Sequence, residues 1–187
     1  METPVALEKP KVEKIKIAEP TTITDPWLLM DTFYSSPEYK QKFQTFLAGK
    51  QISTDVSDKE KEHTFLSSDS AEFAFLDFGL QSVDFRFVKD KYPQDFISRL
   101  DEYKKAIRDV KKLGRQILTD DETLALDETR FNIHSEAARA LVKAGIAPTV
   151  NIGRALTSLI LVDEGLESRE DAQRTTMDKI KSKYRGG

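Results

Sequence analysis

The basic side chains of this sequence are the ones best placed to do chemistry. Between residues 104 and 115 they are separated mainly by steps of three and four, which places most of them on one side of a helix. Lys and Arg on such a face can neutralise backbone phosphates, so the pattern favours a local nucleic-acid site. A solvated face carrying ion pairs such as Asp101–Lys105 would have the same spacing. The candidates for phosphate contact are Arg86, Arg108, Lys111, Lys112, Arg115 and Arg130.

Two clusters of carboxylates form the second group with chemical potential. They are Asp120, Asp121, Glu122, Asp163 and Glu164. A glycosidase-like pair would need two of them to face each other across a cleft. Acids at the start of a helix, which favour its dipole, explain 120–122 more simply. A third interpretation places the carboxylates at contacts between subunits, where their repulsion would act as a release sensitive to pH or Ca²⁺.

Catalytic residues are sparse in this chain. It has no Cys and only two His, so thiolate metal sites and Cys nucleophiles are excluded. His63 falls in a polar segment, and His134 lies one helical turn from Ala138, which is typical of a partly buried helix residue. The motifs HExxH, GxSxG, GxGxxG and the Walker loop do not occur. We therefore expect no enzyme activity, no cofactor and no bound metal.

Length and composition indicate one domain with an extension. The chain has 187 residues, of which 39% are hydrophobic and 33% charged, and its net charge is −3. The first 25 residues are charged and lack the apolar core of a signal peptide. No apolar run approaches the roughly 20 residues that span a bilayer. We expect no membrane partner, no secretion through a signal peptide, and a location in the cytoplasm or in a virion.

The pattern of apolar residues predicts a mainly α fold, an antiparallel helix bundle with an extended N-terminal arm at 1–24. Residues 25–187 are expected to form a single helical domain. Its predicted long helices are about 93–118, 128–144, 148–165 and 169–184. Residues 50–70 are predicted to form a loop, and a short β-hairpin is predicted near 73–88, although 70–78 fits a helical turn equally well. The predicted core residues are Phe96, Leu100, Tyr103, Ile107, Val110, Leu141, Leu156 and Leu159.

Local signals predict where several helices begin and end. Asp25 followed by Pro26, and Ser36 followed by Pro37, are typical helix starts. Gly145 is suited to the left-handed residue that ends a helix, and Pro148 to the first turn of the next. Gly153 is expected to mark a close helix crossing. The dense Phe residues between 73 and 87 are expected in a core or a subunit contact.

Several short stretches, in their order along the chain, resemble rod-shaped plant virus coat proteins of the tobacco mosaic type. They are Asp25-Pro26, Phe43-Gln44-Thr45, Val83-Asp84-Phe85-Arg86-Phe87, and Glu122-Thr123-Leu124 ahead of Thr129-Arg130. The segment 138–148 is also similar to archaeal rod-shaped virus coats. These resemblances imply a helix bundle that stacks into a helical rod and holds RNA or DNA through backbone phosphates. We therefore expect a self-assembling, non-enzymatic coat or nucleocapsid subunit whose main partner is copies of itself.

Two other resemblances imply different roles. Arg130-Phe131-Asn132-Ile133, Ala137-Ala138-Arg139 and Asp163-Glu164-Gly165 resemble the omega subunit of bacterial RNA polymerase. That likeness implies an accessory, non-catalytic subunit of a transcription complex. Residues 140–156 loosely resemble a helix-turn-helix, which would imply a small DNA-binding protein. In that motif, Asn151 and Arg154 stand where apolar core residues belong.

Overall fold

The fold of this computed structural model, which describes residues 22–50, 55–113 and 119–173, is mainly helical. Within α5 the side chains of Val110, Lys111 and Leu113 also lie outside the description. The elements follow in chain order. They are β1 (Thr22–Ile23), α1 (Pro26–Tyr34), α2 (Pro37–Lys50), α3 (Asp58–Leu66), α4 (Asp69–Gln81), β2 (Asp84–Phe85), the 3-10 helix η3 (Lys89–Lys91), α5 (Gln94–Leu113), α6 (Asp120–Lys143) and α7 (Val150–Asp163).

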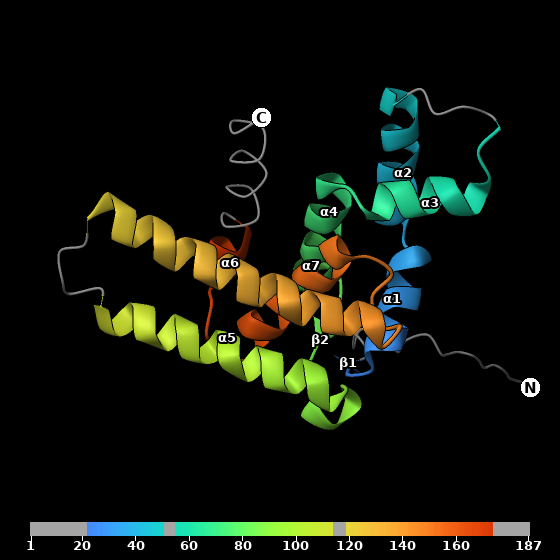
Figure 1. The fold of residues 1–187 in the computed structure, drawn as a ribbon. Helices are drawn as coiled ribbons and strands as arrows, with labels where there is room; N and C mark the ends of the chain where they lie inside the picture. Colours follow the sequence, from blue (N-terminus) through green and yellow to red (C-terminus); the bar gives the residue numbers. More distant parts are fainter. Residues whose placement is uncertain (1–21, 51–54, 114–118, 174–187) are drawn as a thin grey trace, which may run out of the picture.

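The two longest helices form an antiparallel hairpin, and α7 packs between it and α4. α6 contacts both α5 and α7, and α4 contacts α7 on the other side. The ends of α5 and α6 that face each other across residues 114–119 extend away from α1, α2 and α3 (Figure 1). Nearly every residue of α7 is buried. α7 is therefore the centre of the fold, and the far end of the hairpin is its periphery.

The core confirms most of the predicted buried positions. Phe96, Leu100, Leu141 and Leu156 are almost fully inaccessible. Tyr103 and Leu159 are also buried, and Ile107 packs against the core from a partly exposed position. Val110 lies among the undescribed side chains. Close aromatic packing of Phe33 against Phe75, with centroids 5.0 Å apart, joins α1 to α4.

Helix ends follow the local chemistry that the sequence predicts. The Asp25 side chain accepts a hydrogen bond from Trp27 N at 2.9 Å, and Ser36 Oγ accepts one from Tyr39 N at 3.1 Å. Gly145 has a φ of 79°. Its N–H donates to Val142 O, while Ile146 N donates to Leu141 O, which together close α6 in the manner of a Schellman motif.

Several predicted boundaries are wrong. α6 begins at Asp120 rather than near 128, because the Thr119 side chain accepts from Glu122 N and Glu122 accepts from Thr119 N. α7 is capped by Thr149, so Pro148 precedes the cap instead of opening the helix. The last predicted helix begins after Ser168 and is helical over 169–173. The rest of that prediction, and residues 114–118 of the first long helix, lie outside the described residues.

The predicted β-hairpin near 73–88 is also wrong. Residues 69–81 form α4, because the Ser68 side chain caps the helix and Phe75 and Phe78 recur at a helical spacing on its buried side. Only Asp84–Phe85 is a strand, and it pairs in parallel with Thr22–Ile23. The N-terminal arm therefore ends earlier than predicted, since Ile23 is buried in the core. Residues 1–21 of that arm lie outside the described part of the chain.

The predicted loop at 50–70 contains helix α3. Ser57 caps it by accepting a hydrogen bond from Glu60 N at 3.2 Å. Phe65 and Leu66, at its end, are buried against the core. Two buried residues at one end of an otherwise polar segment are too few to produce a visible helical period, which is why the pattern indicated a loop.

Candidate functional site

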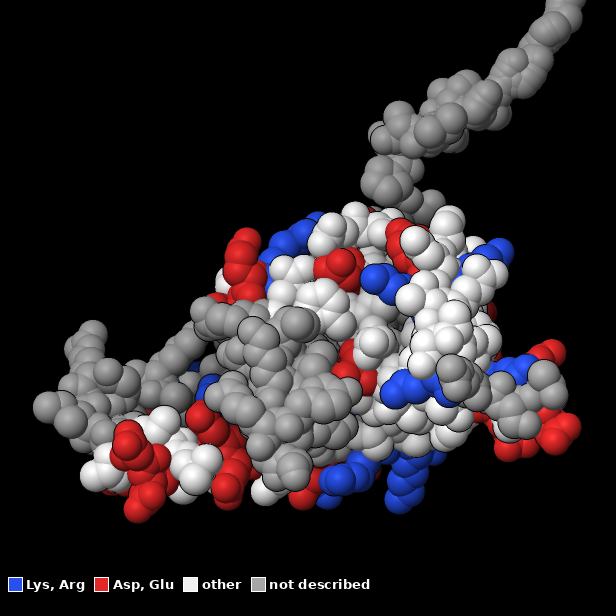
Figure 2. Space-filling view, turned by 90° about the horizontal axis from the view of Figure 1, so that it is seen from above, with Lys and Arg blue, Asp and Glu red and all other residues white. Residues whose placement is uncertain are grey.

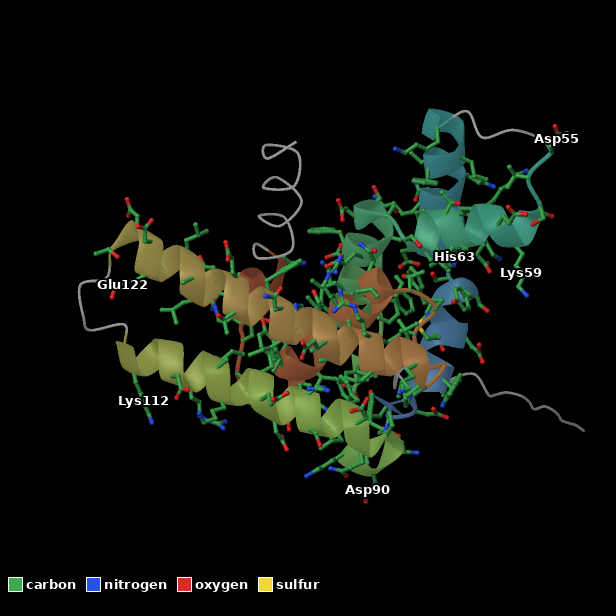
Figure 3. The ribbon with its side chains drawn as sticks, viewed as in Figure 1. Asp55, Lys59, His63, Asp90, Lys112 and Glu122 are labelled. Atoms are coloured by element: carbon green, nitrogen blue, oxygen red, sulfur yellow. The ribbon has the colours of Figure 1, made fainter. Side chains whose placement is uncertain are left out.

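The distal half of the α5–α6 hairpin, which we define as residues 104–113 and 120–131, carries the densest group of predicted site residues. Arg108 and Lys112 are exposed one turn apart on α5, and Lys105 extends the same exposed face. The Lys111 side chain and Arg115 are among the undescribed parts of the chain. In Figure 3, Lys112 lies near the distal end of α5 and Glu122 near the facing end of α6. The tip thus combines a basic helix with an acidic one.

The remaining phosphate candidates do not join this group. The Arg86 guanidinium forms ion pairs with Asp163 at 3.2 Å and with Asp84 at 3.5 Å, beside the short sheet. Arg130 is half-buried on α6 and pairs with Asp127 at 2.5 Å. Acidic and basic side chains are interspersed over the face that Figure 2 shows. The described candidates therefore do not line one continuous basic groove.

The acids at 120–122 have the role of a helix start. Asp120 and Asp121 are exposed in the first turn of α6. The Glu122 carboxylate accepts a hydrogen bond from Thr119 N at 2.9 Å. This backbone hydrogen bond, and a second contact with the Thr119 side chain, lower the pKa of Glu122 because they stabilise its charged form. The capping box accounts for Glu122 without an active-site role.

The second carboxylate pair is engaged inside the chain. Asp163 is largely buried, and besides Arg86 it accepts a hydrogen bond from Phe87 N at 2.9 Å. Glu164 forms an ion pair with Lys104 of α5. Both acids thus tie the end of α7 to the segments around it. A glycosidase-like arrangement would require these groups to face a substrate, and their partners already occupy them.

Sequence reasoning missed a buried polar cluster between α4 and α7. Its centre is Glu72, whose side chain is only 4% exposed. Glu72 Oε1 accepts from Arg154 Nη2 at 3.1 Å and from Asn151 Nδ2 at 3.0 Å. The Arg154 guanidinium also lies 5.7 Å from the centre of the Phe131 ring. The available signal was Asn151 and Arg154 at apolar positions of a helix, because a buried charge requires a partner.

His134 is part of the packing between α5, α6 and α7. It is buried, and its ring stacks on Tyr103 with centroids 5.0 Å apart. Its Nε2 lies 3.1 Å from the Arg154 carbonyl oxygen and 3.5 Å from Ser158 Oγ. These contacts agree with the prediction of a buried helix residue. His63 is exposed on α3, remote from the distal hairpin in Figure 3.

Neither a metal centre nor a membrane segment emerges from the described residues. Among them, no group of three or more His, Asp or Glu side chains is arranged to hold a metal ion. The search of their helices also finds none that is both long and apolar enough to cross a bilayer. The chemistry that these residues do display is charge pairing and apolar contact.

Comparison with known proteins adds no relative. No protein family, no curated protein sequence and no solved structure matches this chain.

Proposed function

We propose that this protein is a non-enzymatic structural subunit that assembles with copies of itself, of the coat or nucleocapsid type. The supporting observation is that large apolar side chains are exposed at two separate places. On α1, Trp27 is 51% exposed and Leu28 is 47% exposed. On the distal hairpin, Leu124 of α6 is 57% exposed. α1 and the start of α6 lie at opposite ends of the molecule (Figure 1).

Two such surfaces suit a subunit that contacts two neighbours. A single exposed apolar residue is ordinary on a monomer, but adjacent exposed residues such as Trp27 and Leu28 mark contact surfaces more often. A subunit with one contact surface stops at a closed pair, whereas separate surfaces at two ends allow an open assembly such as a rod. The proposal therefore requires both ends.

The full-length protein tests this proposal by sedimentation velocity and negative-stain microscopy over a range of concentrations. We expect filaments or other uniform particles. Leu28→Glu and Leu124→Glu should each shorten or abolish them, because a carboxylate cannot be buried in an apolar contact without a partner. Thr45→Glu, on an exposed part of α2, adds the same charge elsewhere and should leave assembly unchanged. A monomer at every concentration would contradict the proposal.

The nucleic-acid part of the proposal has its own measurement. Adding single-stranded RNA or DNA to the same samples should change particle length or yield if phosphates are held. Arg108 and Lys112 are the exposed candidates, and binding through them should weaken as salt is raised, because it releases counterions. Assembly that ignores both polymers would leave a protein-only structural role.

The two other roles remain predictions without structural support. A helix-turn-helix would have to place α7 in a DNA groove, yet α7 is buried between α4 and α6. An omega-like role would need 128–165 to clamp a polymerase subunit. The second half of this segment already packs inside the fold. Co-purification with a polymerase large subunit, mapped to 128–165, is the measurement that would favour it.

A further inference from the structure

Two exposed stripes of opposite charge run along the distal hairpin. On α5 the basic stripe consists of Lys105, Arg108 and Lys112. On α6 the acidic stripe consists of Asp120 and Asp127, with Leu124 between them. Spacings of three, four and seven residues keep each set on one side of its helix. Each helix of the hairpin therefore presents a different charge to its surroundings.

The stripes have local partners that are easily exchanged. Lys105 lies 3.4 Å from Asp109 on its own helix, and Asp127 lies 2.5 Å from Arg130. All four of these side chains are substantially exposed. Exposed pairs of this kind contribute roughly 0–1 kcal/mol to stability, so their replacement by contacts with another molecule is inexpensive. The ion pair between Arg99 and Glu136, which joins α5 to α6, lies nearer the body of the protein.

We propose that two copies of this chain pair through their distal hairpins, with the acidic stripe of each copy on the basic stripe of the other. This inference rests on the proposed self-assembly and names one of its interfaces. If the hairpins lie end past end about a twofold axis, α6 of one copy runs parallel to α5 of the other, because α5 and α6 are antiparallel within a chain. The contact is then a four-helix bundle in which each charge pair occurs twice.

The spacing of the stripes fits this arrangement. Asp120 and Asp127 are seven residues apart, as are Lys105 and Lys112, and seven residues of helix span about 10 Å. Asp120 then faces Lys105 of the other copy while Asp127 faces its Lys112. Leu124 falls between them, opposite Arg108, whose aliphatic stem can cover it. A single register satisfies both charge pairs and the exposed leucine.

A nucleic acid fits the distal hairpin less well than a second copy does. A phosphate backbone that followed the basic stripe would pass close to the exposed acids of α6, and like charges repel it. A second copy carries both signs and uses both stripes. The nucleic-acid outcome is nevertheless distinguishable in the experiment that follows.

The experiment uses two charge-reversed forms of the full-length protein. The first is Lys105→Glu/Lys112→Glu and the second is Asp120→Lys/Asp127→Lys. In either form alone every stripe meets a like charge, so we expect self-association to weaken roughly tenfold or more. Mixing the two forms in equal amounts restores both complementary contacts, and the mixture should associate as strongly as the unaltered protein. Combining all four substitutions in one chain should restore association as well.

Matched controls and alternative outcomes keep the interpretation clear. Lys40→Glu/Lys42→Glu reverses two exposed lysines on α2 and should leave association unchanged. Circular dichroism checks that each form is folded. If every form assembles like the unaltered protein, the hairpin contact is wrong while self-assembly stands. If the unaltered protein is always monomeric, both proposals fail. If the lysine variant loses RNA binding and association never changes, the basic stripe serves nucleic acid and the pairing is refuted.

Discussion

The buried Glu72–Arg154 pair is the individual contact on which the packing of α4 against α7 most depends. Both side chains are largely removed from water, and Asn151 completes the coordination of the same carboxylate oxygen. Taking two charges out of water costs free energy that only their mutual contact offsets. Removing one partner is therefore far more damaging than removing both.

We expect Glu72→Ala to destabilise the protein by about 3 kcal/mol, because it leaves the Arg154 charge buried without its partner. Replacing both residues by Met should recover most of that loss, since no buried charge remains. Urea unfolding followed by circular dichroism measures these differences. Arg86→Ala is the matched control, because its ion pairs lie at the surface and should contribute less than about 1 kcal/mol. Equal losses for Glu72→Ala and the double Met variant would contradict this account.

Among the helices, the crossing of α6 and α7 is set by one small residue. A Cβ added at Gly153 would lie 2.8 Å from the Ala138 carbonyl oxygen and 3.0 Å from its Cα. Those are backbone atoms, which cannot rotate away. The hydrogen bond from His134 to the Arg154 carbonyl depends on the same close approach. The predicted close crossing at Gly153 is thereby confirmed.

Gly153→Ala should separate α6 from α7 and destabilise the protein by about 1–3 kcal/mol, the usual cost of an overpacked core. Gly49→Ala is its control. It lies in α2, where an added Cβ meets nothing within 4 Å, so the better helix propensity of Ala should stabilise the protein by up to about 1 kcal/mol. Thermal and urea unfolding of both variants give the comparison, and a neutral Gly153→Ala would show that the crossing can relax.

The molecule as a whole buries several tyrosines, which links its stability to alkaline pH. Burial is the main cause that raises the pKa of Tyr34 and of Tyr103 to about 12, and it also raises the pKa values of Tyr39 and Tyr92. In the unfolded chain these phenols titrate near 10.0. Because the folded pKa is the higher one, the stabilisation is complete below pH 10 and is lost as pH rises toward the folded value.

We therefore expect the free energy of unfolding, as far as the tyrosines determine it, to decline from about pH 10 upward. Urea midpoints measured across that range, together with phenolate absorbance, provide the test. Four tyrosines that ionise near pH 10 while the protein stays folded would show that they are accessible to solvent. Tyr103→Phe should lessen the alkaline loss, because Phe keeps the stacking on His134 and has no proton to release.

The sequence by itself determined those features whose physics is local. Helix starts at Asp25 and Ser36, the glycine that closes α6, and the periodic apolar face of α5 all depend on residues within a few positions of one another. The acids at 120–122 were likewise recognisable as a helix start. Each of these follows from hydrogen bonds or spacing along a single helix, so no knowledge of distant contacts was needed.

Only the tertiary structure decided the features that join distant segments. The phenylalanines between 73 and 87 suit either a hairpin or a helix. The choice depends on Ser68 and on packing against α1, α2 and α7. The strand at Asp84–Phe85 pairs with Thr22–Ile23, far away in the chain, and Glu72 meets an arginine carried by α7. The free energy of such contacts comes from burial and charge pairing between elements, and no local pattern encodes which elements will meet.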